Sequence, residues 1–163
     1  MSLTVVGHRL TGMAELKDKI RADLTAALKA RDSLRAGTLR MVIAAITNAE
    51  VAGKEARELT DDDVVGVLTS ESKKRREAAE AFDAGNRPEL AEKERAEAAV
   101  LAEYLPEPLT DEEVSAIVAD AIAKTGAEGP KGIGPVMGMV QPLVRGRADG
   151  GAVAAEVRRQ LGA

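Results

Sequence analysis

The chain has 163 residues and a net charge of −4, so any contact with nucleic acid has to come from local basic patches and not from the field of the whole molecule. It contains no cysteine, which excludes disulfides, thiol nucleophiles and zinc sites built on cysteine, and its single histidine, His8, leaves little basis for histidine acid–base catalysis. Only two residues are aromatic while 30 are alanine, and we therefore predict an all-α chain, because strands favour aromatic and β-branched side chains.

The first residues lack the periodicity of a folded element. Residues 1–12 are interpreted as a leader, native or expression-derived, that stays outside the fold, and Met13 is a natural start. The apolar runs are far shorter than the roughly 20 residues that span a bilayer. We expect no membrane contact and a cytoplasmic location.

The N-terminal domain, residues 13–105, is predicted to hold about four helices. The first covers about Ala14 to Ala30, and its apolar stripe is Leu16, Ile20, Leu24 and Leu28. The second is capped by either Asp32 or Ser33. Its apolar face is Leu39, Val42, Ile43 and Ile46, and Gly53 is expected to end it in a left-handed conformation.

The third and fourth helices of this domain carry most of its charge. Thr60, with Asp63 three residues on, resembles a capping box that opens the third helix. Its apolar face, formed by Val64, Leu68, Ala79 and Phe82, is interrupted by the basic run Lys73-Lys74-Arg75-Arg76. The fourth helix is predicted over about Arg87 to Tyr104, with Leu90 and Leu101 as its larger apolar anchors.

Two prolines at residues 106–109 mark a predicted hinge, because proline removes a backbone donor and disfavours helical geometry before it. Residues 110–163 are expected to form a small three-helix domain, the first helix opened by a capping box at Thr110 and ended by Gly126. Its second helix has the apolar stripe Ile133, Val136, Met137, Val140, Leu143 and Val144, with Pro142 expected to kink it or to end its regular part. Val153, Val157 and Leu161 form the stripe of the third.

The turn Gly146-Arg147-Ala148-Asp149-Gly150 joins the last two helices. Asp149 is predicted to cap the last helix, and Gly146 to end the one before. Together with Gly134-Pro135-Val136-Met137-Gly138, this turn resembles the end of the GatB/YqeY family, which includes free-standing YqeY-like proteins and the C-terminus of the GatB component of the glutamine-dependent tRNA amidotransferase.

Further landmarks support the free-standing version, so that the resemblance covers about Ala14 to Leu161: Thr38 to Ile46, Glu92-Lys93-Glu94, Tyr104-Leu105-Pro106 and Gly126-Ala127. The resemblance implies a helical N-terminal domain and a three-helix tail that, in the amidotransferase, helps to hold the body of the tRNA. It also implies a link to carbon–nitrogen ligase activity with glutamine as amido-N-donor. The chain itself has no cysteine, no second histidine and no Gly-rich phosphate loop, and we expect no catalytic residue, no metal site and no cofactor of its own.

Basic residues of the tail are the candidate RNA contacts. Arg145 and Arg147, expected beside Lys131, are the first set, and Arg158 with Arg159 adds a second positive spot. The run Lys73-Lys74-Arg75-Arg76 is a secondary candidate for binding RNA or an acidic partner, although such a run is more often a solvated face. Two functions stay open: a tRNA-binding accessory protein that works with amidotransferase subunits or other tRNA-handling enzymes, and a helical protein-interaction module that binds no RNA.

Overall fold

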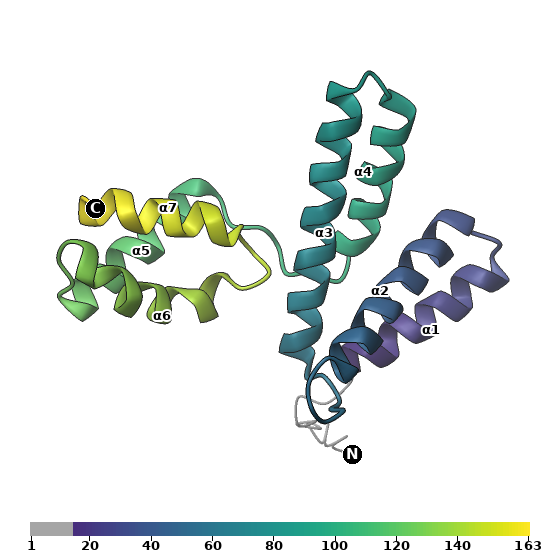
Figure 1. Ribbon diagram of the computed structural model, residues 1–163, viewed down its shortest axis with the longest axis horizontal. Helices are drawn as coiled ribbons and strands as arrows, with labels where there is room; N and C mark the ends of the chain where they lie inside the picture. The colour runs from purple at the N-terminus through teal and green to yellow at the C-terminus, as the bar shows by residue number, and fades with distance from the viewer. Residues whose placement is uncertain (1–14) are drawn as a thin grey trace, which may run out of the picture. The chain divides into compact units, whose positions relative to one another are not determined.

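The structure is a computed structural model that describes residues 15–163; the predicted leader and His8 lie outside this range. The described residues form seven α-helices, one short 3-10 helix and no strand, which confirms the all-α prediction (Figure 1). The chain divides into two compact units between Tyr104 and Leu105. None of the helices in residues 15–163 has both the length and the apolarity needed to cross a bilayer.

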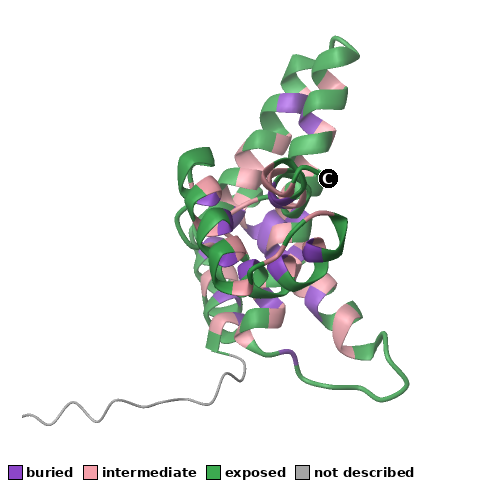
Figure 2. Cartoon of the chain, turned by 90° about the vertical axis from the view of Figure 1, so that its left-hand side faces the viewer, coloured by how far each residue is buried: buried purple, intermediate pink, exposed green. Residues whose placement is uncertain are grey.

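The first unit consists of two helical hairpins. Helices α1 (Glu15–Lys29) and α2 (Ser33–Val51) form one, and α3 (Asp61–Ala84) and α4 (Pro88–Ala102) form the other, as Figure 1 shows. Figure 2 shows the buried residues following the inner faces of the helices. They include Ile20, Leu39, Val42, Ile46, Val64, Leu68, Ala79, Ala91 and Leu101.

Two details of the first hairpin, at Leu28 and Gly53, differ from the prediction, and the structure decides between the two predicted caps of α2. Leu28 is 46% exposed, because the α1 stripe runs past the end of the core near the turn between the helices. Asp32 and not Ser33 caps α2, accepting a hydrogen bond from the Arg35 amide at 3.1 Å. Helix α2 ends at Val51, and Gly53 does not adopt a left-handed conformation.

A buried ion pair fixes the segment after α2. Lys17, which lies outside the predicted apolar stripe of α1, is buried and donates to both carboxylate oxygens of Glu50 at 2.7 and 2.9 Å. Glu50 also accepts from the Leu59 amide at 3.2 Å, and its carbonyl accepts from the Arg57 amide at 2.9 Å. One carboxylate thus connects α1, α2 and the approach to α3, and the hydrogen bond from Lys17 holds the pKa of Glu50 below its ordinary value.

A second polar network closes the first unit at its last residue. The buried Tyr104 hydroxyl donates to Asp23 at 2.5 Å and accepts from Arg35 at 3.3 Å. Arg35 also pairs with Glu103 at 2.5 Å, and the Lys19 ammonium lies 5.0 Å from the centroid of the tyrosine ring. The network attaches the end of α4 to both helices of the first hairpin.

The second unit packs three short helices around a core of small side chains. They are α5 (Asp111–Thr125), α6 (Ile133–Val144) and α7 (Gly150–Leu161), and the 3-10 turn η1 (Pro130–Gly132) precedes α6. The buried hydrophobic residues of this unit are Val114, Val118, Ala121, Val136, Val140, Val144, Val153 and Val157. Leu143, which was predicted in this core, is 53% exposed. It follows the buried Val140 by three residues, but its side chain lies at the outer edge of the apolar stripe.

Most of the predicted caps are present. Thr60 and Asp63 form a complete capping box, with Thr60 accepting from the Asp63 amide at 3.2 Å and Asp63 accepting from the Thr60 amide at 3.1 Å. Only half of the box forms at Thr110, whose hydroxyl accepts from the Glu113 amide at 3.1 Å. Gly126 ends α5 with a φ of 64°, in the left-handed region.

Candidate nucleic-acid interface

The turn between α6 and α7 is held by its own backbone. Gly146 has a φ of 72°, which an L side chain adopts only with strain. This conformation lets the Arg147 and Ala148 amides donate to the Val144 carbonyl at 2.8 and 3.1 Å, which closes α6. Asp149 accepts from the Ala152 amide at 3.0 Å and begins α7 as predicted.

Arg147 has a structural role that the sequence did not reveal. Its Nε donates to the Glu107 carbonyl at 3.0 Å, and its own carbonyl accepts from the Leu109 amide at 2.8 Å. Two bonds therefore attach the Pro-rich segment before α5 to the turn. No local sequence pattern indicates a contact between residues forty positions apart. The bond also means that the Arg147 guanidinium uses part of its hydrogen-bonding capacity inside the second unit.

The predicted cluster of Lys131, Arg145 and Arg147 is not formed as one patch. Lys131 precedes α6 and Arg145 follows it, and the 12 residues of α6 separate them by about 18 Å at 1.5 Å per residue. Both side chains are exposed, and neither makes an ion pair with any described residue. Arg147 lies at the Arg145 end.

The two arginines near the C-terminus, Arg158 and Arg159, differ in their ion pairing. Helix α7 contacts η1, which brings the α7 end that carries Arg158 and Arg159 toward Lys131. Arg159 pairs with Glu156 at 2.6 Å, and this hydrogen bond lowers the pKa of Glu156 to about 2. Arg158 is exposed and makes no ion pair among residues 15–163. Lys131 and Arg158 therefore lie near the start of α6, and Arg145 and Arg147 lie near its end.

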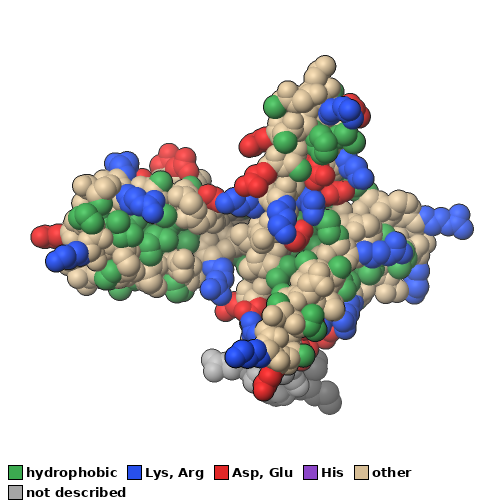
Figure 3. Space-filling model, viewed as in Figure 1, with side chains coloured by type: hydrophobic (Ala, Val, Ile, Leu, Met, Phe, Trp, Pro, Cys, Tyr) green, Lys and Arg blue, Asp and Glu red, His purple; other side chains and the backbone are tan. Residues whose placement is uncertain are grey.

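Helix α6 presents a face without charge between these two ends. None of its residues, Ile133 to Val144, is ionisable, and Met139 and Leu143 are exposed. Gly134 and Gly138, one turn apart, are exposed too, and a Cβ at either would meet nothing within 4 Å. Figure 3 shows hydrophobic side chains of this unit gathered between separate Lys and Arg side chains.

Two of the four cations on α3, Lys74 and Arg75, pair with carboxylates, while Lys73 and Arg76 are exposed. Arg75 is only 17% exposed and lies among three carboxylates of α3 and α4, Glu71 at 3.0 Å, Glu94 at 3.7 Å and Glu97 at 3.6 Å. Lys74 pairs with Glu71 at 3.2 Å. Arg75 thus joins α3 to α4. It does not belong to a solvated face either, because its side chain points into the unit.

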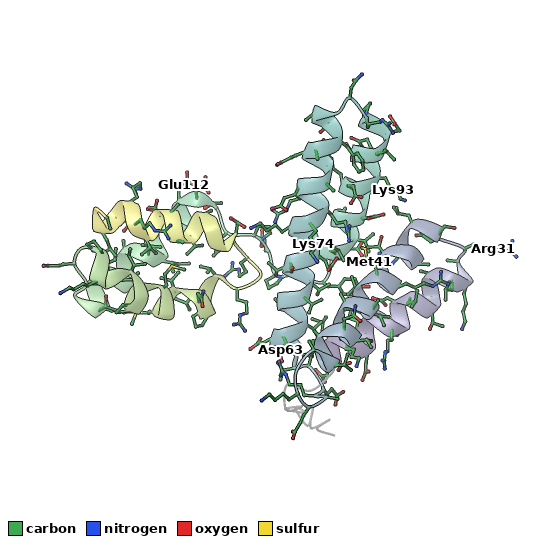
Figure 4. All side chains as sticks on the ribbon, viewed as in Figure 1. Arg31, Met41, Asp63, Lys74, Lys93 and Glu112 are labelled. Carbon is green, nitrogen blue, oxygen red and sulfur yellow. The ribbon has the colours of Figure 1, made fainter. Side chains whose placement is uncertain are left out.

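A hollow of ≈ 500 Å³ lies between α2 and α3 and was not predicted. It contains both signs of charge: Arg57 pairs with Asp63 at 3.1 Å, and Lys74 pairs with Glu71. Figure 4 shows Lys74 and Asp63 on α3. Because each cation has a carboxylate beside it, the hollow offers no net attraction to a phosphate.

The sequence model of the family described as Yqey-like protein matches residues 17–161. The chain belongs to this family. It is 32% identical over 148 residues to the altered inheritance of mitochondria protein 41, mitochondrial, of Pyrenophora tritici-repentis, which covers 89% of this chain and 80% of that protein. It is 36% identical over 98 residues to an uncharacterized protein of Schizosaccharomyces pombe, covering 60% of this chain and 77% of that protein. The likeness of the tail to the GatB component of the amidotransferase stays a prediction.

Proposed function

We propose that this YqeY-like protein binds tRNA through its second unit and assists a glutamine-dependent tRNA amidotransferase. The observation that carries the proposal is the arrangement of α6, an uncharged exposed face with unpaired cations at both ends, Lys131 at one and Arg145 at the other. Phosphate contacts from Lys and Arg position a protein on a nucleic acid. Cations about 18 Å apart along α6 reach phosphates of different nucleotides.

The face between the cations suits the wide, shallow minor groove of an RNA duplex. Exposed backbone at Gly134 and Gly138 permits a close approach to sugar 2′-hydroxyls, which is how proteins recognise double-stranded RNA by shape. Single-stranded RNA is read largely by stacking on aromatic rings. Both aromatic residues of the chain, Phe82 and Tyr104, belong to the first unit. The proposed ligand is therefore the folded, base-paired body of a tRNA.

In this proposal the chain supplies binding and no chemistry. Family resemblance connects it with carbon–nitrogen ligase activity that uses glutamine as amido-N-donor, and we assign that activity to partner subunits. The cytoplasmic location stays a prediction, and the mitochondrial term belongs to the name of the Pyrenophora relative.

The test is the affinity of the full chain for deacylated tRNA, measured by fluorescence anisotropy at low salt. Lys131→Glu combined with Arg145→Glu is expected to weaken binding at least tenfold, because two favourable phosphate contacts become repulsive. Arg147 is left unchanged in this variant, since its bond to Glu107 makes it part of the fold.

Arg87→Glu is the matched control, because Arg87 is exposed, makes no side-chain cap bond and lies in the first unit. It should leave the affinity within about twofold. Absence of binding to tRNA by the unaltered chain, or equal loss in the variant and the control, would refute the proposal.

A further inference from the structure

The turn between α1 and α2 carries a hollow of ≈ 300 Å³ at the tip of the first hairpin. Its apolar part is formed by Ala27 and Leu28 from the end of α1 and by Ala36 from α2. Arg31 and Arg40 line the same hollow. Asp32, whose carboxylate caps α2, also lines it, so the site combines an apolar surface with two cations and one carboxylate.

Two large apolar side chains at this tip are not covered by the first unit, whereas Ala27 and Ala36 are buried. Leu28 is 46% exposed and Leu34, at the start of α2, is 38% exposed. These are two of the three large hydrophobic side chains of the first unit that the structure records as exposed, Val51 being the third. Covering apolar surface stabilises a complex, so a partner that brings an apolar side chain to this hollow gains from contact.

The cations at the tip are available to a partner. Neither Arg31 nor Arg40 makes an ion pair with any residue in the described range, in contrast to Arg57 and Lys74 at the larger hollow. Figure 4 shows Arg31 at the tip, its side chain directed away from the helices. Because the whole chain has a net charge of −4, this local positive charge stands out against an acidic protein.

The backbone at Arg31 is strained. Its φ is 58°, in the left-handed region that usually takes glycine or asparagine after a helix end. A residue with a side chain adopts such a conformation only with strain, and positions of this kind concentrate at functional sites. Glycine would relieve this strain, but it would also remove one of the two cations.

Two features favour a protein ligand over a phosphate. A helix N-terminus attracts phosphate through free amides and its dipole, but at α2 the Asp32 carboxylate already accepts from the Arg35 amide at 3.1 Å. An apolar floor adds nothing to phosphate binding. Carboxylates beside an apolar side chain complement both parts of the hollow.

We propose that the tip of the α1–α2 hairpin binds an acidic amphipathic helix of a partner protein. An apolar side chain of that helix packs on Leu28, the exposed apolar side chain of the hollow, while flanking carboxylates pair with Arg31 and Arg40. This surface lies in the first unit and the proposed tRNA contact lies in the second. The two proposals are independent, and together they make the chain an adaptor between an RNA and a protein.

The probe is a fluorescein-labelled 16-residue helical peptide with leucines at helical spacing and glutamates between them, titrated with the full chain. A second peptide has glutamine for every glutamate, and a third has alanine for every leucine. The full chain should bind the first peptide and bind each of the others at least several-fold more weakly. Arg31→Gln with Arg40→Gln should weaken binding of the first peptide about tenfold, the effect of losing two exposed ion pairs.

Leu28→Ser should also weaken peptide binding, whereas Arg87→Gln, the same change at an exposed arginine of the same unit, should leave it within about twofold. Circular dichroism checks that each variant is folded. No binding of the first peptide at millimolar concentration, or equal binding by the double variant and the unaltered chain, overturns the proposal. So does a loss of tRNA affinity in the double variant, because the tip would then be an RNA contact.

Discussion

At the scale of single residues, Tyr104 has the clearest consequence for stability. Its hydroxyl donates to Asp23 at 2.5 Å from a buried position, and hydrogen bonds to charged groups contribute about 1.5–3 kcal/mol. Tyr104→Phe should lower the unfolding free energy at pH 7 by about 1–2 kcal/mol, since Asp23 keeps its partial exposure and its bond from Lys19 at 2.9 Å. Urea unfolding checks this value.

The same substitution predicts a pH dependence. Burial and the bond to Asp23 raise the pKa of Tyr104, so the stability that its hydroxyl adds is complete below the unfolded value of about 10 and declines as the pH rises further. The hydrogen bond from Tyr104 lowers the pKa of Asp23, so this stability is also complete above about pH 4 and declines as the pH falls. The difference in unfolding free energy between the unaltered chain and Tyr104→Phe should be constant from about pH 5 to 9 and smaller outside this range. A difference that is the same at every pH contradicts this account.

Single residues also show which contacts could be predicted from the sequence and which could not. The caps at Thr60 and Asp149 were predictable, because a side chain and an amide three residues apart make the bond. The bond from Arg147 to Glu107 was not, because it joins residues forty positions apart. Arg147 therefore looked like a free RNA contact, and the structure shows it partly used by the fold.

At the scale of elements, α6 is the helix in which one substitution is expected to raise stability and weaken tRNA binding. Gly138 lies inside the helix with a helical backbone and open space where a Cβ would be. Gly138→Ala should therefore raise the unfolding free energy by about 0.5–1 kcal/mol. If the face meets RNA closely, the added methyl group should weaken tRNA binding several-fold.

Gly37→Ala is the control for this prediction. Gly37 is an exposed glycine of α2 whose Cβ position is also open, so alanine should stabilise the chain without changing tRNA affinity. Thermal unfolding and anisotropy titration on the two variants give both quantities. Unchanged tRNA affinity in Gly138→Ala would exclude this part of α6 from the interface.

Helix existence and most buried positions followed from periodicity, but the limits of each stripe did not. Leu28 and Leu143 continue their stripes in sequence and are exposed, because a stripe is buried only as far as a neighbouring helix extends. Arg75 shows the converse. It stood in a run of four cations, and carboxylates from α3 and α4 surround it, which only the pairing of the two helices reveals.

At the scale of the whole molecule, the net charge of −4 limits what kind of RNA binding is physically reasonable. An acidic protein gains little from long-range attraction, so binding should depend on a few local phosphate contacts. Four cations of the second unit, Lys131, Arg145, Arg147 and Arg158, have no ion pair among the described residues. Few contacts imply weak affinity and a shallow dependence on salt.

The most direct measurement is therefore the slope of log affinity for deacylated tRNA against log salt concentration, for the full chain and for Lys131→Glu with Arg145→Glu. Each phosphate neutralised contributes a slope of about −0.9 on a duplex, so two to four contacts predict roughly −2 to −4. The double variant should bind more weakly and lose about 2 from the magnitude of this slope. A slope near zero, or one that the double variant leaves unchanged, would contradict tRNA binding through the second unit.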